Sequence, residues 1–96
     1  MISKLPENVK QSGASAVFTS GSVPDAILNW HTTKAHVWGK IVIHKGTATY
    51  EILTDPVERV ELNSERPGFI EPEQPHRLIP DDGCEFQIQF FKVPEN

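Results

Sequence analysis

The chain is poor in cysteine, in basic charge and in long apolar runs. Its 96 residues include one cysteine, Cys84, which excludes an internal disulfide and is typical of a reducing compartment. Nine basic against 13 acidic residues give a net charge of −4, and the basic residues are scattered, so we expect no nucleic-acid partner and no binding to anionic lipid. No apolar stretch approaches a membrane span, and residues 1–10 lack the apolar region of a signal peptide. These absences predict a soluble, cytoplasmic protein.

Eight prolines and six glycines interrupt the chain and leave little room for helices. Only residues 24–30 favour one or two helical turns, with Ser22 as a possible N-cap, and an extended arm is the alternative for the same residues. The length predicts a single domain, which we place at residues 15–96. The polar residues 1–14 are interpreted as an N-terminal arm that is ordered only if it docks on the sheet.

Most of the chain has the residue types and spacing of short strands. The strongest candidate is residues 37–44, rich in β-branched and aromatic side chains. The Lys45-Gly46 step predicts a hairpin turn, after which residues 47–53 pair back on this strand. Further strands are expected at residues 15–19, 57–62, 69–70, 76–79 and 84–93. Short strands separated by frequent turns predict an antiparallel all-β sandwich or barrel.

Two of the four histidines are placed by their surroundings. His76 follows a bend stiffened by Pro72 and Pro75, which directs its side chain as it enters a strand. It is either a functional residue or a strand-start histidine without a role. His31 lies in a polar loop before the strongest strand, where it is either a ligand at the mouth of a barrel or a solvated loop residue.

The remaining candidates have weaker patterns. His36 is five residues after His31, a spacing that matches no strict metal motif. His44 has the opposite parity to its apolar neighbours and is expected on the outer face of its strand. Glu71 and Glu73 are candidate oxygen ligands beside His76, although the pattern favours solvated turn residues.

The last predicted strand and the cysteine add few further candidates for functional residues. Phe86, Ile88 and Phe90 share one face of residues 84–93, and Gln87 and Gln89 share the other, which is either the wet wall of a pocket or the outer surface. The acidic residues around the cysteine are expected to raise its thiol pKa. The sequence contains no Gly-rich phosphate loop, nucleophile elbow or CxxC pair.

Several short motifs together resemble a known family. A histidine before a strand, a glycine at the next hairpin and a later Pro-His step are similar to the motifs of cupins. The chain resembles more closely the small cupin-like domain at the N-terminus of tellurite-resistance TehB proteins and the YeaR-like proteins, over about residues 16–93. The matching stretches are Pro24, His31-Thr-Thr-Lys34, Val37-Trp-Gly-Lys40, Gly46, Ile70-Glu-Pro72, Pro75-His76-Arg77 and the aromatic end from Phe86 to Phe91.

The resemblance implies a single-domain, cupin-like antiparallel β-barrel of the jelly-roll type around a divalent metal site. His31 then takes the place of the first-motif histidine and His76 that of the second-motif histidine. Gly39 stands where the usual glutamate ligand lies, and Thr33 stands where the partner of His31 lies. Zn²⁺, Fe²⁺, Mn²⁺ or Ni²⁺ would therefore need other donors. The candidates for these donors are Glu71, Glu73, Gln87, Gln89, His36 and water.

Three functions remain open from the sequence. The first is a module that binds a metal or a small molecule, which the resemblance links to tellurite, oxyanion or nitrosative stress. The second is a metal-dependent enzyme of the oxygenase or isomerase type that uses His31 and His76. The third is a homodimeric interaction module with a vestigial pocket, whose outer sheet, with Trp38 and His44, forms the interface. Binding is favoured over catalysis, because only half of an acid/base pair can be named.

Overall fold

The strongest predicted strand forms the centre of a five-stranded sheet. In the computed structural model, which describes residues 1–94, β3 (Trp38–Lys45) lies between β8 (Glu85–Lys92) and β6 (Gly68–Ile70). β8 also pairs with β1 (Lys10–Ala14) and with β2 (Phe18–Thr19), and every pairing is antiparallel. The inward positions of β3 are buried and its outward positions are half-buried or exposed, which is the period-2 pattern of a sheet with one face on a core.

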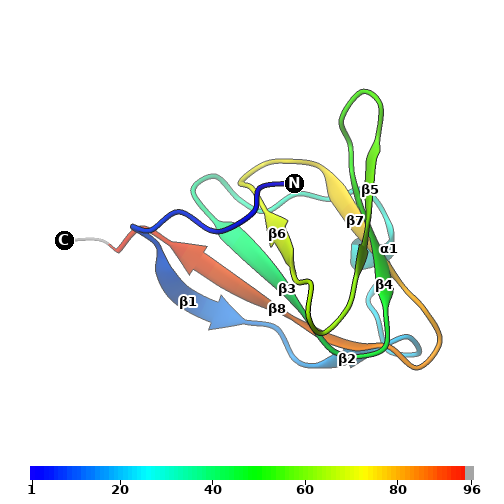
Figure 1. Cartoon of the computed structure of the whole chain (residues 1–96). Helices are drawn as coiled ribbons and strands as arrows, with labels where there is room; N and C mark the ends of the chain where they lie inside the picture. The colour runs from blue at the N-terminus through cyan, green and yellow to red at the C-terminus, as the bar shows by residue number, and fades with distance from the viewer. Residues whose placement is uncertain (95–96) are drawn as a thin grey trace.

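A three-stranded antiparallel sheet faces the first one. β4 (Ala48–Ile52) lies between β5 (Glu58–Leu62) and β7 (His76–Pro80). The two sheets diverge in Figure 1, with the short helix α1 (Asp25–Leu28) beside β7. The core between the sheets takes side chains from both, including Ile41, Ile70 and Phe86 from the first and Tyr50 and Leu78 from the second. The predicted all-β antiparallel class is confirmed, and no ladder among residues 1–94 closes the two sheets into one barrel.

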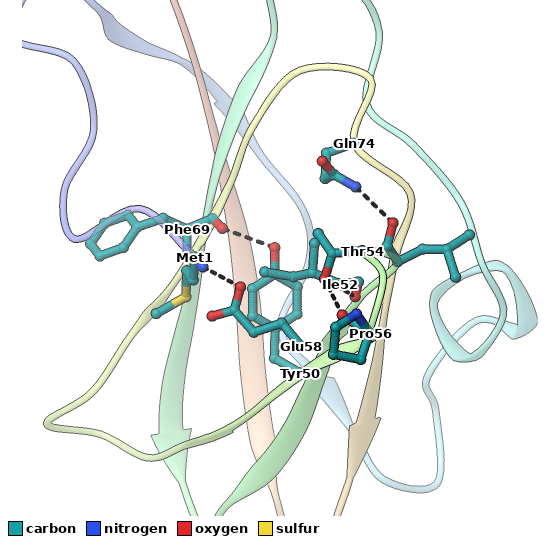
Figure 2. A network of polar contacts seen from close by, with 9 residues as sticks. Met1, Tyr50, Ile52, Thr54, Pro56, Glu58, Phe69 and Gln74 are labelled. Atoms are coloured by element: carbon teal, nitrogen blue, oxygen red, sulfur yellow. Dashed lines mark hydrogen bonds and ion pairs between the residues drawn. The ribbon is translucent and has the colours of Figure 1, made fainter.

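Tyr50 ties the two sheets together across the core. Its hydroxyl donates a hydrogen bond of 2.8 Å to the backbone carbonyl of Phe69 in β6, as Figure 2 shows. In the same view the amino group of Met1 pairs with the carboxylate of Glu58, beside Tyr50. Burial raises the pKa of Tyr50, with the negative charges of Glu58 and Glu71 acting in the same direction, so the hydroxyl remains a donor.

The predicted hairpin around Gly46 is wrong. β3 pairs with β6 and β8, whereas β4 pairs with β5 and β7, so the turn carries the chain from one sheet to the other. Gly46 has a φ of 76°, and a Cβ atom there would lie 3.1 Å from Cα of Cys84. A glycine therefore fits both the left-handed backbone and the close passage of the chain at Cys84.

Two other local features differ from or extend the predictions. The helix is shorter than predicted, with Pro24 at the N-cap position, and the hydroxyl of Ser22 instead accepts a hydrogen bond of 2.9 Å from the backbone N–H of Thr19. The N-terminal arm docks on the sheet, since its last five residues form β1 against β8.

The last two residues of the predicted domain, 95–96, lie outside the described residues. Within residues 1–94, no helix is long and apolar enough to cross a membrane.

Candidate functional site

The two histidines that the sequence singles out are neighbours across an antiparallel bridge. The backbone N–H of His31 donates to the carbonyl of His76 at 3.0 Å, and the N–H of His76 donates to the carbonyl of His31 at 2.9 Å. His76 is the first residue of β7, directly after Pro75, whose carbonyl accepts a hydrogen bond from the N–H of Leu53. The bridge therefore holds the segment at His31 against β7.

Their imidazole rings also meet and share one tautomer. The ring centres of His31 and His76 lie 4.3 Å apart, with the ring planes tilted by 57°. Nδ1 of His31 lies 2.9 Å from the carbonyl oxygen of Asn29, and Nδ1 of His76 lies 2.7 Å from that of Gln74. Because a carbonyl oxygen only accepts, each Nδ1 carries the hydrogen. In the neutral imidazole, each Nε2 then has a free lone pair.

His76 is held neutral by its surroundings. It is 1% exposed, and Tyr50 lies edge-on to its ring with 5.9 Å between ring centres. Burial lowers the pKa of His76 to about 4. The charge of His31 also lowers this pKa, whereas the hydrogen bond to the Gln74 carbonyl raises it. Nε2 of His76 is buried and has no hydrogen-bond partner among the described residues. It is therefore an acceptor with its capacity unused.

His31 and His76 line a cavity of about 460 Å³ between the inner face of the five-stranded sheet and the loop that follows His31. This volume is within the usual range for small-molecule sites. Its apolar walls are Phe18, Ile27, Val37, Ile70, Ile88 and Phe90. Its polar lining is Ser15, His31, Thr32, Thr33, Lys34 and His76. The cavity is thus an apolar pocket with the histidine pair as its distinctive polar feature.

The two acidic residues proposed as metal ligands lie elsewhere. Glu71 and Glu73 are exposed, and neither is among the residues that line the cavity within the described chain. His36 is also exposed, in a backbone conformation with a φ of 66°. Of the five protein residues considered as donors besides the histidine pair, Glu71, Glu73 and His36 are therefore absent from the cavity lining.

The glutamines of β8 lie on the outer face. The Gln87 side chain donates to the carbonyl of Ser15 at 2.9 Å and lies 3.4 Å from Nε2 of His44. His44 is exposed, as predicted for the outer face of its strand. Gln89 shares the outward parity of Gln87, opposite to the buried Phe86 and Ile88. Neither glutamine therefore belongs to the cavity.

The cupin resemblance places a glutamate ligand at residue 39, but the space beside this glycine is filled by a neighbouring side chain. Gly39 is buried on the inner face of β3 and is the cross-strand partner of Ile70 in β6. A Cβ atom on Gly39 would lie 2.9 Å from Cδ1 and 3.1 Å from Cβ of Ile70. Ile70 thus occupies the space that a carboxylate ligand would need. Across residues 1–94, no three His, Cys, Asp or Glu side chains gather in a way that could hold a metal ion.

The residues present are therefore a poor fit to the three-ligand or four-ligand divalent metal site that the cupin resemblance implies. The histidine pair supplies two nitrogen donors, and the carboxylates proposed beside it lie away from the cavity. A site with two protein nitrogens and water ligands is expected to bind a metal weakly.

Sequence reasoning did not identify the cluster on the other side of the histidine bridge. Glu51 in β4 is 2% exposed, because Arg59 of β5 and Arg77 of β7 cover it as its cross-strand neighbours. Nε of Arg77 lies 2.5 Å from one carboxylate oxygen, and Nη2 of Arg59 lies 2.5 Å from the other. The pKa of Glu51 is lowered mainly by the hydrogen bond from Arg77. Burial raises this pKa, and the hydrogen bond and charge of Arg59 lower it further.

Arg77 connects this cluster of Glu51, Arg59 and Arg77 to the histidine bridge, and we call the cluster the brace. The guanidinium of Arg77 lies 4.5 Å from the ring centre of Trp30, and these two residues are the chain neighbours of His76 and His31. The bridge is thus flanked by the histidine pair on one side and by the Trp30–Arg77–Glu51 contact on the other. No local pattern signals this contact, because it depends on which strands flank β4.

The arrangement is better suited to binding than to acid–base or nucleophilic chemistry. A histidine whose pKa is about 4 is a weak base near neutral pH, whereas a general base works best with a pKa near the working pH. Burial raises the pKa of the Cys84 thiol, and Asp81 and Glu85 raise it further, which disfavours a reactive thiolate.

Comparison with known proteins gives one family and one fold. A family model described as the TehB-like domain matches residues 14–88. TehB from Haemophilus influenzae has a TM-score of 0.81 and 24% identity over 91% of this chain and 32% of that chain, so the chain spans about a third of TehB. A protein from E. coli strain K12 has a TM-score of 0.86 and 20% identity over 99% of this chain and 100% of that one. No curated protein matches the chain. At these identities the structural likeness establishes the fold alone.

Proposed function

This chain belongs to the TehB-like domain family, and we propose that it is a small-molecule binding module whose site is the cavity at His31 and His76. The observation that carries this proposal is the histidine pair itself. Two side chains far apart in the sequence meet at an apolar cavity, each oriented by a hydrogen bond from Nδ1 to a backbone carbonyl. Oriented polar groups in an apolar pocket are the usual features of a small-molecule site.

The cost of burying His76 supports a role in binding. A fully buried imidazole with an unused acceptor is destabilising by roughly 1–3 kcal/mol relative to a satisfied one. An apolar side chain at this position would avoid that cost. A ligand that hydrogen bonds to Nε2 would recover it.

Fragment binding followed by NMR tests the proposal. We expect fragments to shift the resonances of cavity residues such as Ile70, His76 and Ile88. Val37→Trp places a large ring at the half-buried wall of the cavity and should abolish these shifts. Val42→Trp is the matched control, because Val42 is a half-buried valine on the outward side of β3. Fragments that leave the cavity resonances unchanged, or that bind equally to both variants, would contradict the proposal.

A second candidate is a weak divalent metal site at the same pair. The shared tautomer favours it, since metal-bound imidazoles commonly use one nitrogen while the other donates to a carbonyl. His31 and His76 would supply the two nitrogens, with solvent completing the coordination. We rank this candidate second, because Ile70 fills the place of a third protein ligand.

The biological setting follows from the family resemblance. We propose that the protein acts in the cytoplasm as a homodimer in a response to tellurite, other oxyanions or nitrosative stress. Light scattering of the purified protein measures the oligomeric state. Growth of a deletion strain on tellurite, complemented by the wild type or by Val37→Trp, measures whether that response needs the cavity. Equal rescue by the wild type and by Val37→Trp would show that the stress response does not need the cavity.

A further inference from the structure

We propose that the ligand of this cavity is an uncharged, largely apolar organic molecule that donates a hydrogen bond to Nε2 of His76. This inference rests on the proposed binding function and narrows it to one chemical class. It follows from which hydrogen-bonding groups of the cavity are already used and which remain free.

The most buried polar residue that lines the cavity, His76, offers an acceptor. Nδ1–H of His76 is committed to the carbonyl of Gln74 at 2.7 Å, which leaves only the lone pair on Nε2. His31, in its neutral form, has the same tautomer through its contact with the carbonyl of Asn29. Neither neutral imidazole therefore offers an N–H to a ligand, and a ligand must bring the hydrogen itself.

Two of the hydroxyl groups in the lining are also committed. The Ser15 hydroxyl donates to the carbonyl of Ala16 at 2.7 Å and accepts from the N–H of Ile88 at 3.0 Å. The Thr33 hydroxyl donates to the carbonyl of Val37 at 2.8 Å. Both hydrogens point to backbone oxygens and not to a ligand, so the polar lining is weighted towards acceptors.

The charge of the lining argues against an anionic ligand. Among the described residues that line the cavity, Lys34 is the single permanent cation, and it is exposed. A buried anion would need donors or a compensating charge, and His76 could provide one only by taking up a proton against its burial. The six apolar walls instead favour a ligand body of rings or alkyl groups.

Indole and benzofuran are the matched probes. They have nearly the same shape, but indole has an N–H donor where benzofuran has an oxygen. We expect indole to bind the wild type about three- to tenfold more tightly, the range for one hydrogen bond to a neutral acceptor. The preference should vanish in His76→Phe and persist in His44→Ala, which changes an exposed histidine on the outer face. Benzoate and inorganic phosphate should bind more weakly than indole.

A measurement on the wild type guards against a His76 variant that does not fold. Imidazole nitrogen resonances report both the tautomer and a hydrogen bond to Nε2. We expect the Nε2 resonance of His76 to move on addition of indole and to remain in place with benzofuran.

The outcomes separate the two proposals. Equal binding of indole and benzofuran within the cavity, or tighter binding of either anion, would overturn the donor inference and leave the binding site intact. Absence of any cavity response to these probes and to the fragments would overturn both the inference and the proposed function.

Discussion

His31 and His76 exchange both backbone hydrogen bonds and bring their imidazole rings to 4.3 Å of each other. The pair lies at the edge of the three-stranded sheet, where the bridge attaches the loop of His31 to β7. Each ring is oriented by a backbone carbonyl only two residues earlier in the chain. The site is therefore built from two short local motifs that the fold brings together.

Acid should weaken the fold through His76. Its folded pKa is about 4 and its ordinary value is 6.5, so the unfolded chain takes up a proton at a higher pH than the folded chain does. The free energy of unfolding should therefore fall as pH drops from about 6.5 to about 4, by roughly 3 kcal/mol in total. Urea denaturation at several pH values measures this change.

Variants identify the source of that pH dependence. His76→Phe should flatten the profile across this window, whereas His44→Ala, which removes an exposed histidine, should leave the slope in place. The Glu51 carboxylate has a lowered pKa, so its contribution is lost only below its ordinary value of 4.5. A wild-type profile that is flat from about pH 7 to about pH 5 would contradict the buried, neutral state of His76.

Gly39 and Ile70 should be coupled energetically. Gly39→Ala forces its Cβ against Cδ1 of Ile70 and should destabilise the fold by about 1–3 kcal/mol. Ile70→Val removes Cδ1 and should lower stability by about 0.5–1.5 kcal/mol when introduced alone. The double variant should lose less than the sum of the two, measured by chemical denaturation.

Gly13→Ala is the control for this cycle, because a Cβ atom at Gly13 would meet no heavy atom within 4 Å. It should change stability little and should add to Ile70→Val without coupling. Strict additivity of Gly39→Ala and Ile70→Val would show that Ile70 does not fill the place of a side chain at residue 39.

Removing the charge of Glu51 should loosen the brace behind the histidine bridge. Glu51→Gln ends its ion pairs with Arg59 and Arg77, and we expect a loss of about 1–3 kcal/mol in stability. The effect is moderate because both arginines reach solvent. Glu61 is exposed and lies on the same face of β5 as Arg59, so Glu61→Gln should have little effect on the melting temperature. Equal effects of the two changes would argue against the brace.

A divalent metal, if it binds, should depend on the histidines and not on the acidic bend. Zn²⁺ or Ni²⁺ at a hundredfold excess over its Kd would stabilise the fold by about 2.7 kcal/mol. The combined change His31→Ala and His76→Ala should abolish this thermal shift, and Glu71→Gln with Glu73→Gln should leave it unchanged, because both glutamates are exposed. Elemental analysis of the same samples measures occupancy. Loss of metal in the glutamate variant would instead show that Glu71 or Glu73 is a metal ligand.

The positions of most strands follow from local sequence. Residues 37–44 are rich in β-branched and aromatic side chains, and the observed β3 (Trp38–Lys45) differs by one residue at each end. β1 was not predicted, because its residues Lys-Gln-Ser-Gly-Ala are all exposed and lack the alternation of a half-buried strand. It is a strand because its backbone pairs with β8.

The candidate site was predictable only in part. His76 and His31 stood out because of the stiff Pro-His step and the family resemblance, and both line the cavity. Glu71 and Glu73 flank a proline close to His76 in the sequence, but closeness along a bent chain does not bring side chains to the same side. Both carboxylates lie in solvent while His76 is buried.

The sequence by itself determined the all-β class, most strand positions and the identity of the two histidines, because alternation, proline and glycine act over a few residues. Only the tertiary structure decided that the turn at Gly46 crosses between sheets, that Ile70 fills the space beside Gly39, and that His31 meets His76. These features depend on which strands pair and which faces pack. That choice is made by contacts between distant segments, which leave no local pattern in the chain.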